Sequence, residues 1–482
     1  MNVLKSLRDK YASLSDVKKT ALWHTFCNVA QRGASVITTP IFTRLLTTGE
    51  YGLCSVYLAW FEIFLIITSL NVQNEGLNNG LIRFENDKDG FTSASAGLAV
   101  TMTLCWAGVY LLLRPQIDAL TGLSSFVMLF MFIELVFNPP LYLWINRNRY
   151  DFRYRRPTAV MLLYSVLYPV VAIAAVLHTQ YRAEARIISI AGFQGVFGCV
   201  FLIWLLYRGR RFYDARYWKF AFTFNLPLVL YHMSQTLLNR ADSIMINYYT
   251  GTADAGVYNV AYTAATLSLL VVSGINGSFN PWMYRRLKEG NHGELGRQAL
   301  NLCALVALGT VALTAFAPDI IRILATGDYV EAQWIIPPVS ASVFFIFTYM
   351  IFANVEMYLG ETRFVSLITV AGAGLNVVLN AVFIRLYGYI AAGWTTLVCY
   401  ALIALWHYVY MLRACRRHGI ERPIFRGRAL ALLSLGVLAA TFIMLLVYRL
   451  GYVRYAVIAA AAAVVWLERG RLMGALGIRR GE

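Results

Sequence analysis

Eight ionisable side chains fall inside stretches of this sequence that are apolar enough to cross a lipid bilayer. A charged group at the centre of a membrane helix costs at least about 2.5–3.5 kcal/mol, so each such group is a candidate functional residue. The chemistry open to them is anion binding, proton transfer or the holding of a small cation. The eight residues are His24, Arg32, Glu62, Glu134, His232, Arg240, Asp242 and Glu356.

Two arginines, Arg32 and Arg240, are the deepest cations. A guanidinium group binds phosphate oxygens through two parallel hydrogen bonds and keeps its proton, so the pair suits an anionic, phosphate-bearing substrate. The alternative is internal pairing: Arg32 with Glu62 or Glu134, and Arg240 with Asp242. Residues two apart on one helix do not face each other, which weakens the last of these pairings.

The neighbouring polar residues have two interpretations each. Glu62, Glu134 and Asp242 could couple transport to a proton or sodium ion, or could balance the arginine charges. Side-chain amides could hydrogen-bond sugar hydroxyls or join helices to each other. The amides closest to the arginines are Asn28, Gln31, Gln235 and Asn239, with Asn276 and Asn280 further along. His24 and His232 are interpreted as polar residues satisfied by their neighbours, and Glu356 as a group close enough to a span end to reach the interface.

The composition requires these residues to be carried by a membrane protein. Of the 482 residues, 59% are hydrophobic and 14% are charged, and the mean hydropathy is +0.57. Soluble proteins average about 45–50% apolar and about 25% charged residues. These values exclude a soluble globular enzyme and a disordered chain, and spans of about 20 residues with short loops leave no room for a large soluble domain.

The apolar runs predict an all-α integral membrane fold with about fourteen transmembrane helices. The predicted spans are 21–45, 51–71, 92–113, 123–146, 158–177, 187–207, 220–249, 255–280, 297–317, 334–358, 364–384, 389–412, 429–448 and 453–468. The expected domains are an amphipathic N-terminal segment (1–20), an N-lobe (21–207), a basic linker (208–219), a C-lobe (220–412), a basic loop with the last two helices (413–468) and a tail (469–482).

A weak internal repeat supports two six-helix lobes. Residues 31–35 (QRGAS) resemble residues 239–243 (NRADS), which places Arg32 and Arg240 at comparable positions 208 residues apart. Gly52 opens the second span and Gly256 opens the eighth, 204 residues later. Paired lobes of this kind are common among transporters.

The loop charges give an orientation. Of the 42 Lys and Arg residues, 32 fall on the side of the membrane that holds the N-terminus, eight fall on the other side and two lie inside spans. This bias predicts a multi-pass protein of the cell membrane with both termini in the cytoplasm. It also accounts for most of the net charge of +17, so a nucleic-acid partner is disfavoured.

The motifs of several enzymes are missing from the sequence. It has no G-x-x-x-x-G-K-[ST] phosphate loop, no H-E-x-x-H zinc motif and no long outer loop that could hold a catalytic site. The seven cysteines fit neither a disulfide framework nor a zinc site. Asp87 and Asp89 have the D-x-D spacing of metal–sugar-nucleotide sites, but a solvated turn is the better interpretation. We therefore predict no catalytic residue, cofactor or bound metal.

Several stretches resemble the bacterial polysaccharide-repeat flippases (O-antigen and capsule type) of the MOP superfamily. Residues 225–262 (NLPLVLYHMSQTLLNRADSIMINYYTGTADAGVYNVAY) are similar to the pattern of that family's seventh and eighth spans. Residues 44–52 and 80–84 resemble its first-to-second junction and the stretch after the second span. PDIIRILATGDYVEAQWI (318–335) and NAVFIRLYGYIAAGWTT (380–396) match later patterns, with Ala391-Ala392 where the family usually has Gly-Ala.

The resemblance implies two six-helix lobes around a central cavity, followed by two extra helices. It also implies an activity: moving undecaprenyl-diphosphate-linked oligosaccharide repeats from the inner to the outer leaflet by alternating access without ATP, for surface polysaccharide synthesis. Cationic residues line the cavity in many members, a role that Arg32 and Arg240 fit. The expected partners are this lipid-linked glycan, membrane lipid, a coupling proton or sodium ion, and polysaccharide polymerase machinery.

Three other functions stay open on the sequence alone. A multidrug or cation antiporter of the same superfamily would favour an acidic cavity, which the two deep arginines argue against. A lipid II-type flippase has no feature against it. A membrane glycan polymerase or ligase would need an outward-facing catalytic site.

Overall fold

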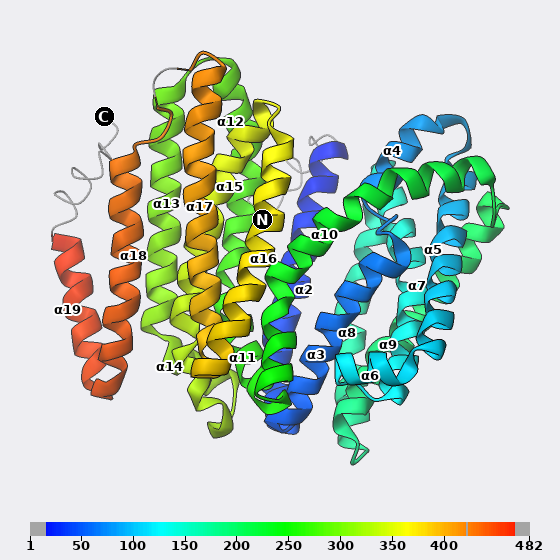
Figure 1. Ribbon diagram of the computed structural model, residues 1–482, viewed down its shortest axis with the longest axis horizontal. Helices are drawn as coiled ribbons and strands as arrows, with labels where there is room; N and C mark the ends of the chain where they lie inside the picture. Colours follow the sequence, from blue (N-terminus) through cyan, green and yellow to red (C-terminus); the bar gives the residue numbers. More distant parts are fainter. Residues whose placement is uncertain (1–15, 421–422, 468–482) are drawn as a thin grey trace, which may run out of the picture. The chain divides into compact units, whose positions relative to one another are not determined.

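The computed structural model describes residues 16–420 and 423–467, and within these ranges the chain is helical, without strands (Figure 1). The chain divides into two compact units, residues 1–256 and 257–482. The expected all-α membrane fold is therefore confirmed, whereas the surface segment expected at 1–20 falls mostly outside the described residues.

The described part of the first unit contains seven long helices, with short elements between some of them. They are α2 (Asp16–Leu45), α3 (Thr48–Ser69), α4 (Glu75–Arg83), η1 (Glu85–Asp87), α5 (Lys88–Leu112), α6 (Arg114–Thr121), α7 (Ser125–Tyr150), α8 (Arg155–Leu177), α9 (Arg182–Gly209) and α10 (Ala215–Tyr249). Helix α11 (Thr252–Ala265) begins in this unit and ends in the next.

The second unit continues to the end of the described chain. Its elements are α12 (Ser268–Lys288), α13 (His292–Ala315), α14 (Ala317–Leu324), η2 (Gly327–Trp334), α15 (Ile336–Tyr358), α16 (Thr362–Tyr387), α17 (Ala391–Arg417), α18 (Gly427–Val447), η3 (Tyr448–Leu450) and α19 (Val453–Leu467).

Every predicted span coincides with helical structure, but one span is broken. The eighth, expected at 255–280, is divided into α11 and α12 at Thr266 and Leu267. Ten helices of the described chain are long and apolar enough to cross a membrane; α2, α10, α11, α12 and α19 are not among the ten. The protein is thus a multi-pass membrane protein, and the count of fourteen stays a prediction.

The expected linker at 208–219 is mostly helical. Helix α9 runs to Gly209 and α10 begins at Ala215, capped by the Asp214 carboxylate, which accepts hydrogen bonds from the backbone amides of Arg216 and Tyr217. Helix α10 packs against α3, α4 and α5, so it belongs to the first compact unit. The division into lobes at this linker is not tested by that grouping and stays a prediction.

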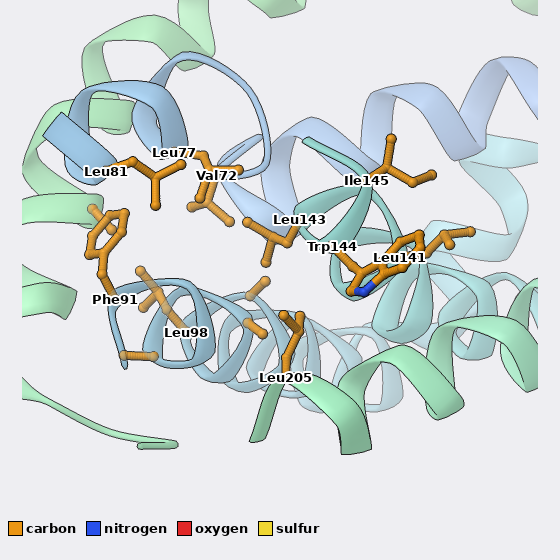
Figure 2. Close-up of a cluster of buried hydrophobic side chains, with 14 of the residues drawn as sticks. Val72, Leu77, Leu81, Phe91, Leu98, Leu141, Leu143, Trp144, Ile145 and Leu205 are labelled. Carbon is orange, nitrogen blue, oxygen red and sulfur yellow. The ribbon is translucent and has the colours of Figure 1, made fainter. Parts of the chain in front are cut away.

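A hydrophobic cluster lies beneath the short helix α4 (Figure 2). Leu77 and Leu81 of α4 are fully buried and lie over Phe91 and Leu98 of α5. The cluster continues through α7 and α9, where its members include Leu141, Leu143, Trp144, Ile145 and Leu205. Since α4 falls in a segment that the apolar runs left as a loop, this packing explains why so short and polar a helix forms there.

Candidate functional site

Two glycines bring the start of α3 and the start of α11 into direct backbone contact. A Cβ atom at Gly52 would lie 1.8 Å from the Thr252 carbonyl oxygen, and one at Gly256 would lie 2.1 Å from the Thr48 carbonyl oxygen. Each hypothetical Cβ also lies close to the other glycine's backbone nitrogen, at 2.9 Å and 3.1 Å. The two positions that the sequence repeat relates thus meet in space, and both require glycine because no side chain fits between the helices.

The principal feature of the site is an ion pair between α10 and α3. Arg240 donates from Nε to Glu62 Oε2 at 2.8 Å and from Nη2 to Glu62 Oε1 at 2.5 Å. The side chains are 30% and 39% exposed, respectively, so neither is sealed inside the protein. Two parallel charge-assisted hydrogen bonds are the strongest way to hold a guanidinium group, and a phosphate offers the same geometry as a carboxylate.

This ion pair bears on the choice that the sequence left open between internal pairing and substrate binding at Arg240. Arg240 has a carboxylate partner on another helix, Glu62, 178 residues away in the sequence; the pairing with Asp242 stays a prediction. The structure thus shows internal pairing at Arg240, and substrate binding there stays a prediction.

The amides expected beside Arg240 follow one side of α10. His232, Gln235 and Asn239 are spaced three and four residues apart, which places them along one helical stripe. Gln235 Nε2 donates to Tyr231 Oη at 3.2 Å, and Asn239 Nδ2 donates to the Gln235 carbonyl oxygen at 2.8 Å. These bonds lie within one helix, Asn239 is exposed, and the expected contacts of both amides with a sugar stay predictions.

The three acidic candidates differ in their burial and in their hydrogen-bond partners. Glu134 of α7 is 3% exposed and accepts a hydrogen bond from the hydroxyl of Tyr57 at 2.7 Å. Asp242 of α10 is 1% exposed, whereas Glu62 is half-buried in its pair with Arg240. The structure therefore brings Glu62 together with Arg240 and gives Glu134 a tyrosine partner from α3.

The first-span candidates are only partly covered by the described structure. Arg32, Asn28 and Gln31 lie in α2, where the side chains of Arg32 and Asn28 fall outside the described residues. Gln31 is half-buried. Their expected roles in substrate binding stay predictions.

The D-x-D motif is part of an ionic network. Asp87 caps α5 through the Gly90 amide at 3.0 Å and accepts the Tyr217 hydroxyl at 2.8 Å. Asp89 accepts from Arg208 at 3.0 Å and from Arg147 at 3.3 Å. Both side chains are 38% exposed, and they join the start of α5 to the ends of α7 and α9 and the start of α10, so the solvent-exposed turn also holds helices together.

The second unit contains a buried pair that the sequence analysis treated as an interfacial group. Glu356 of α15 is 0% exposed, and His407 of α17, which was not considered, is 1% exposed; their closest atoms, Oε2 and Nδ1, are 2.8 Å apart. Glu356 therefore does not reach the interface. Asn354 of α15 donates to Asn276 and Asn280 of α12 at 3.2 and 2.8 Å, which makes those amides contacts between helices.

Sequence reasoning also missed a polar group at the end of α7. Arg149, Asn146 and Tyr150 line a cavity with residues of α4. A search for charges inside spans passes over Arg149 because it lies in the basic segment that follows the predicted fourth span. The amide-rich stretch 71–79 (NVQNEGLNN) was the signal that could have indicated this region.

The fold and the site together define a multi-span membrane transporter of the MOP-superfamily type. The sequence matches the family described as "Polysaccharide biosynthesis protein" over residues 17–286, more than half of the chain, and also matches the family MatE over residues 227–382. The chain belongs to the polysaccharide biosynthesis protein family. This confirms the resemblance that the sequence motifs indicated.

The relatives agree with that placement. "Lsg locus putative protein 1" of Haemophilus influenzae is 21% identical over 344 residues, covering 68% of this chain and 81% of the relative. Among solved structures, the lipid II flippase MurJ in an inward closed conformation has a TM-score of 0.71 at 13% identity, with coverage of 95% of this chain and 100% of MurJ.

An inward-facing multidrug resistance MATE transporter of the MOP superfamily has a TM-score of 0.59 at 12% identity, with coverage of 81% of this chain and 96% of the transporter. At these identities MurJ and the MATE transporter establish the fold alone.

Proposed function

We propose that this protein is a flippase that moves undecaprenyl-diphosphate-linked oligosaccharide repeat units from the inner to the outer leaflet of the bacterial cytoplasmic membrane. It works by alternating access without ATP hydrolysis and has both termini in the cytoplasm. The family match to polysaccharide biosynthesis proteins and the MurJ-like fold support this proposal.

The observation that carries the proposal is the ion pair between Arg240 and Glu62. A guanidinium group inside a transporter is costly unless an anion neutralises it. Glu62 supplies that anion in the absence of substrate, and its half-exposed position allows replacement by an anionic ligand. A diphosphate group would take over the two hydrogen bonds of Glu62, so the cation is neutralised both before and after loading.

The other candidate residues have proposed roles that accompany the replacement of Glu62 by the diphosphate. Arg32 supplies a second cation for the diphosphate. Gln31, Asn28, Gln235 and Asn239 bind sugar hydroxyls. Glu62, released from Arg240, together with Glu134 and Asp242, balances charge or carries a coupling proton or sodium ion. The polyprenyl chain remains in the lipid.

Lipid II flippase activity is the second candidate, since the MurJ fold matches over nearly the whole chain. Both candidates need a diphosphate site, so the Arg240–Glu62 pair does not separate them. A drug antiporter needs an acidic cavity instead, and a polymerase or ligase would process glycans that have already crossed the membrane.

Leaflet-resolved analysis of glycolipids tests the proposal. In cells that lack the protein, completed polyprenyl-linked repeat units should accumulate on the cytoplasmic side, and wild-type protein should restore their export. Accumulation of lipid II in place of repeat units would favour the second candidate. Completed but unpolymerised units on the outer side would indicate a polymerase or ligase, and unchanged glycolipids would indicate the antiporter.

A variant series then links the activity to the pair. Arg240→Gln and Arg32→Gln should each reduce export while the protein remains folded in the membrane, and Arg240→Lys should retain part of the activity because it keeps the charge. Wild-type export by the double Gln variant would overturn the assignment. Single cysteines at Thr252 and Ser366 would report the topology, the first labelled from outside and the second protected.

A further inference from the structure

A polar cavity of about 400 Å³ lies between the start of α4 and the end of α7 in the first unit. Asn74, Glu75 and Asn78 line it from the α4 side, and Asn146, Arg149 and Tyr150 line it from the α7 side. The charge bias assigns this end of the unit to the cytoplasm. None of the six residues belongs to the site around Arg240.

The α4 wall of the cavity is held rigidly. The turn after α3 contains two successive non-glycine residues with positive φ, Leu70 at 52° and Asn71 at 53°, a conformation that is costly unless the surroundings enforce it. The Asn71 side-chain oxygen accepts hydrogen bonds from the amides of Gln73 and Asn74, each at 2.9 Å. The turn therefore fixes Asn74 at the edge of the cavity.

Close packing on the opposite face of α4 fixes the helix itself. A Cβ atom at Gly76 would lie 2.2 Å from Asn225 Nδ2 of α10, and one at Gly80 would lie 2.0 Å from the Phe91 ring. Leu77 and Leu81 are buried in the cluster of Figure 2. With these four residues facing the protein, Glu75 and Asn78 remain exposed on the cavity side.

The α7 wall presents a guanidinium group whose hydrogen-bond partners in the described part of the chain are neutral. Arg149 Nη1 donates to Asn146 Oδ1 at 3.2 Å, and Nη2 lies 3.0 Å from Met161 Sδ. Asn146 is itself anchored, since its Nδ2 donates to the Gln73 carbonyl oxygen at 2.7 Å. Among the described residues, no carboxylate forms an ion pair with Arg149, whereas Arg147, two residues earlier, pairs with both Asp89 and Asp151.

The remaining groups add an aromatic face and acceptors for hydroxyl groups. The ammonium group of Lys88 lies 5.2 Å from the centre of the Tyr150 ring, which brings a second cation to the cavity's edge. The Glu75 carboxylate is held by His232 Nε2 at 3.1 Å. A fixed arginine suits a phosphate, amide and carboxylate oxygens suit sugar hydroxyls, and the apolar face of a tyrosine suits the C–H face of a sugar ring.

We propose that this cavity binds a sugar phosphate: Arg149 holds the phosphate, and Asn74, Glu75, Asn78 and Tyr150 contact the sugar. In a flippase it would receive the headgroup of the lipid-linked substrate at the cytoplasmic end before the headgroup reaches Arg240, so the source of the ligand rests on the proposed function. The binding chemistry itself does not depend on transport.

The test uses the full-length protein in lipid nanodiscs and farnesyl-diphosphate-linked N-acetylglucosamine as the probe. Asn78→Asp adds a negative charge to the cavity at an exposed position, so folding is preserved. Asn79→Asp is the matched control, because Asn79 is the next exposed residue of α4 and does not line the cavity. Arg149→Gln is compared in the same way with Arg153→Gln, an exposed arginine outside the cavity.

Both cavity variants should weaken probe binding by about tenfold or more: Arg149→Gln loses a hydrogen bond to a charged group, and the carboxylate of Asn78→Asp repels the phosphate. The two controls should change binding by less than about twofold. Equal effects of Asn78→Asp and Asn79→Asp, or unchanged binding by Arg149→Gln, would overturn the site. Competition with N-acetylglucosamine 1-phosphate identifies the source: displacement by this soluble compound indicates a free sugar phosphate, and resistance to it indicates a lipid-linked headgroup.

Translocation measured in vesicles separates the two proposals. If wild-type protein binds the probe but moves no lipid-linked glycan, the flippase assignment fails and the cavity stands. If glycan moves and Asn78→Asp binds and transports like Asn79→Asp, the cavity fails and the flippase assignment stands.

Discussion

Arg240 and Glu62 are joined by two hydrogen bonds, at 2.8 and 2.5 Å, between helices that are far apart in the sequence. Arg240 lies on α10 and Glu62 on α3, and both helices belong to the first compact unit. In the proposed function, Glu62 neutralises Arg240 in the absence of substrate and the diphosphate of the substrate takes its place. Variants of these two residues can show whether the ion pair serves only the structure or also binds substrate.

Exchanging the two charges provides that separation. The double variant Glu62→Arg, Arg240→Glu restores an ion pair between α3 and α10, so thermal stability should recover most of what either single variant loses. Export should remain at least about tenfold below wild type, because the diphosphate would meet a carboxylate on α10. Recovery of both stability and export would show that the pair serves structure alone.

Removing one member of the buried pair of Glu356 and His407 should destabilise the protein more than removing both members. His407→Leu leaves the Glu356 carboxylate at 0% exposure without its partner, and breaking a buried pair in this way costs about 3–5 kcal/mol. The double variant Glu356→Leu, His407→Leu removes both polar groups and should recover most of that loss. Thermal unfolding in detergent compares these two variants with wild type; a double variant that is no more stable than His407→Leu would contradict this account.

Gly52→Ala should destabilise the protein because its new methyl group would meet the Thr252 carbonyl oxygen. Overpacking of this kind costs about 1–3 kcal/mol. Gly108→Ala on α5 is the control: a Cβ there meets no atom within 4 Å, and alanine should stabilise the helix by about 0.5–1 kcal/mol. Scanning fluorimetry should therefore shift the two unfolding temperatures in opposite directions, and equal shifts would argue against the close contact.

The contact between Glu75 and His232 predicts a pH-dependent contribution to stability. The hydrogen bond with the His232 ring lowers the pKa of the Glu75 carboxyl from its ordinary value. A carboxyl whose pKa is lower in the folded state stabilises the protein above its unfolded pKa, about 4.3, and this contribution is lost as the pH falls through the folded pKa.

Glu75→Gln should accordingly be less stable than wild type near neutral pH, by less than about 1 kcal/mol because Glu75 is largely exposed. Unfolding temperatures of the two proteins should converge as the solution is acidified below pH of about 4. His232→Phe should show the same convergence because it removes the partner. A difference that widens on acidification would show that Glu75 is stabilised by some other contact.

The arrangement of helices was largely predictable, because apolar runs bounded by charge determine where membrane helices lie. The break at Thr266 and Leu267 was not, since neither residue is a helix breaker. Helix α4 was missed because a nine-residue polar helix has no apolar run. Its signal was local: Gly76 and Gly80 lie four residues apart beside Leu77 and Leu81, the pattern of a short helix packed closely on its neighbours.

The site was predictable in its residue types and not in its pairings. Charge inside a span singled out Arg240, Glu62 and Glu134, and the structure gives Arg240 and Glu62 each other as partners and Glu134 the hydroxyl of Tyr57. Which carboxylate meets which cation depends on helix rotation and on which helices are neighbours, and spacing along the chain encodes neither. Arg149 was missed for a different reason: it lies at a helix end within a basic segment. Its neighbour Arg147 forms ion pairs with carboxylates and Arg149 forms none among the described residues, a difference that only the structure shows.

The contact between Gly52 and Gly256 also limits how this protein can evolve. Each glycine is confronted mainly by main-chain atoms of the other helix, the carbonyl oxygens of Thr252 and Thr48. A clash with a side chain can be relieved by shortening that side chain, but a carbonyl oxygen is present whatever residue occupies the position. A selection for revertants of Gly52→Ala should therefore return glycine at position 52, and replacements at Thr252 should not restore the contact.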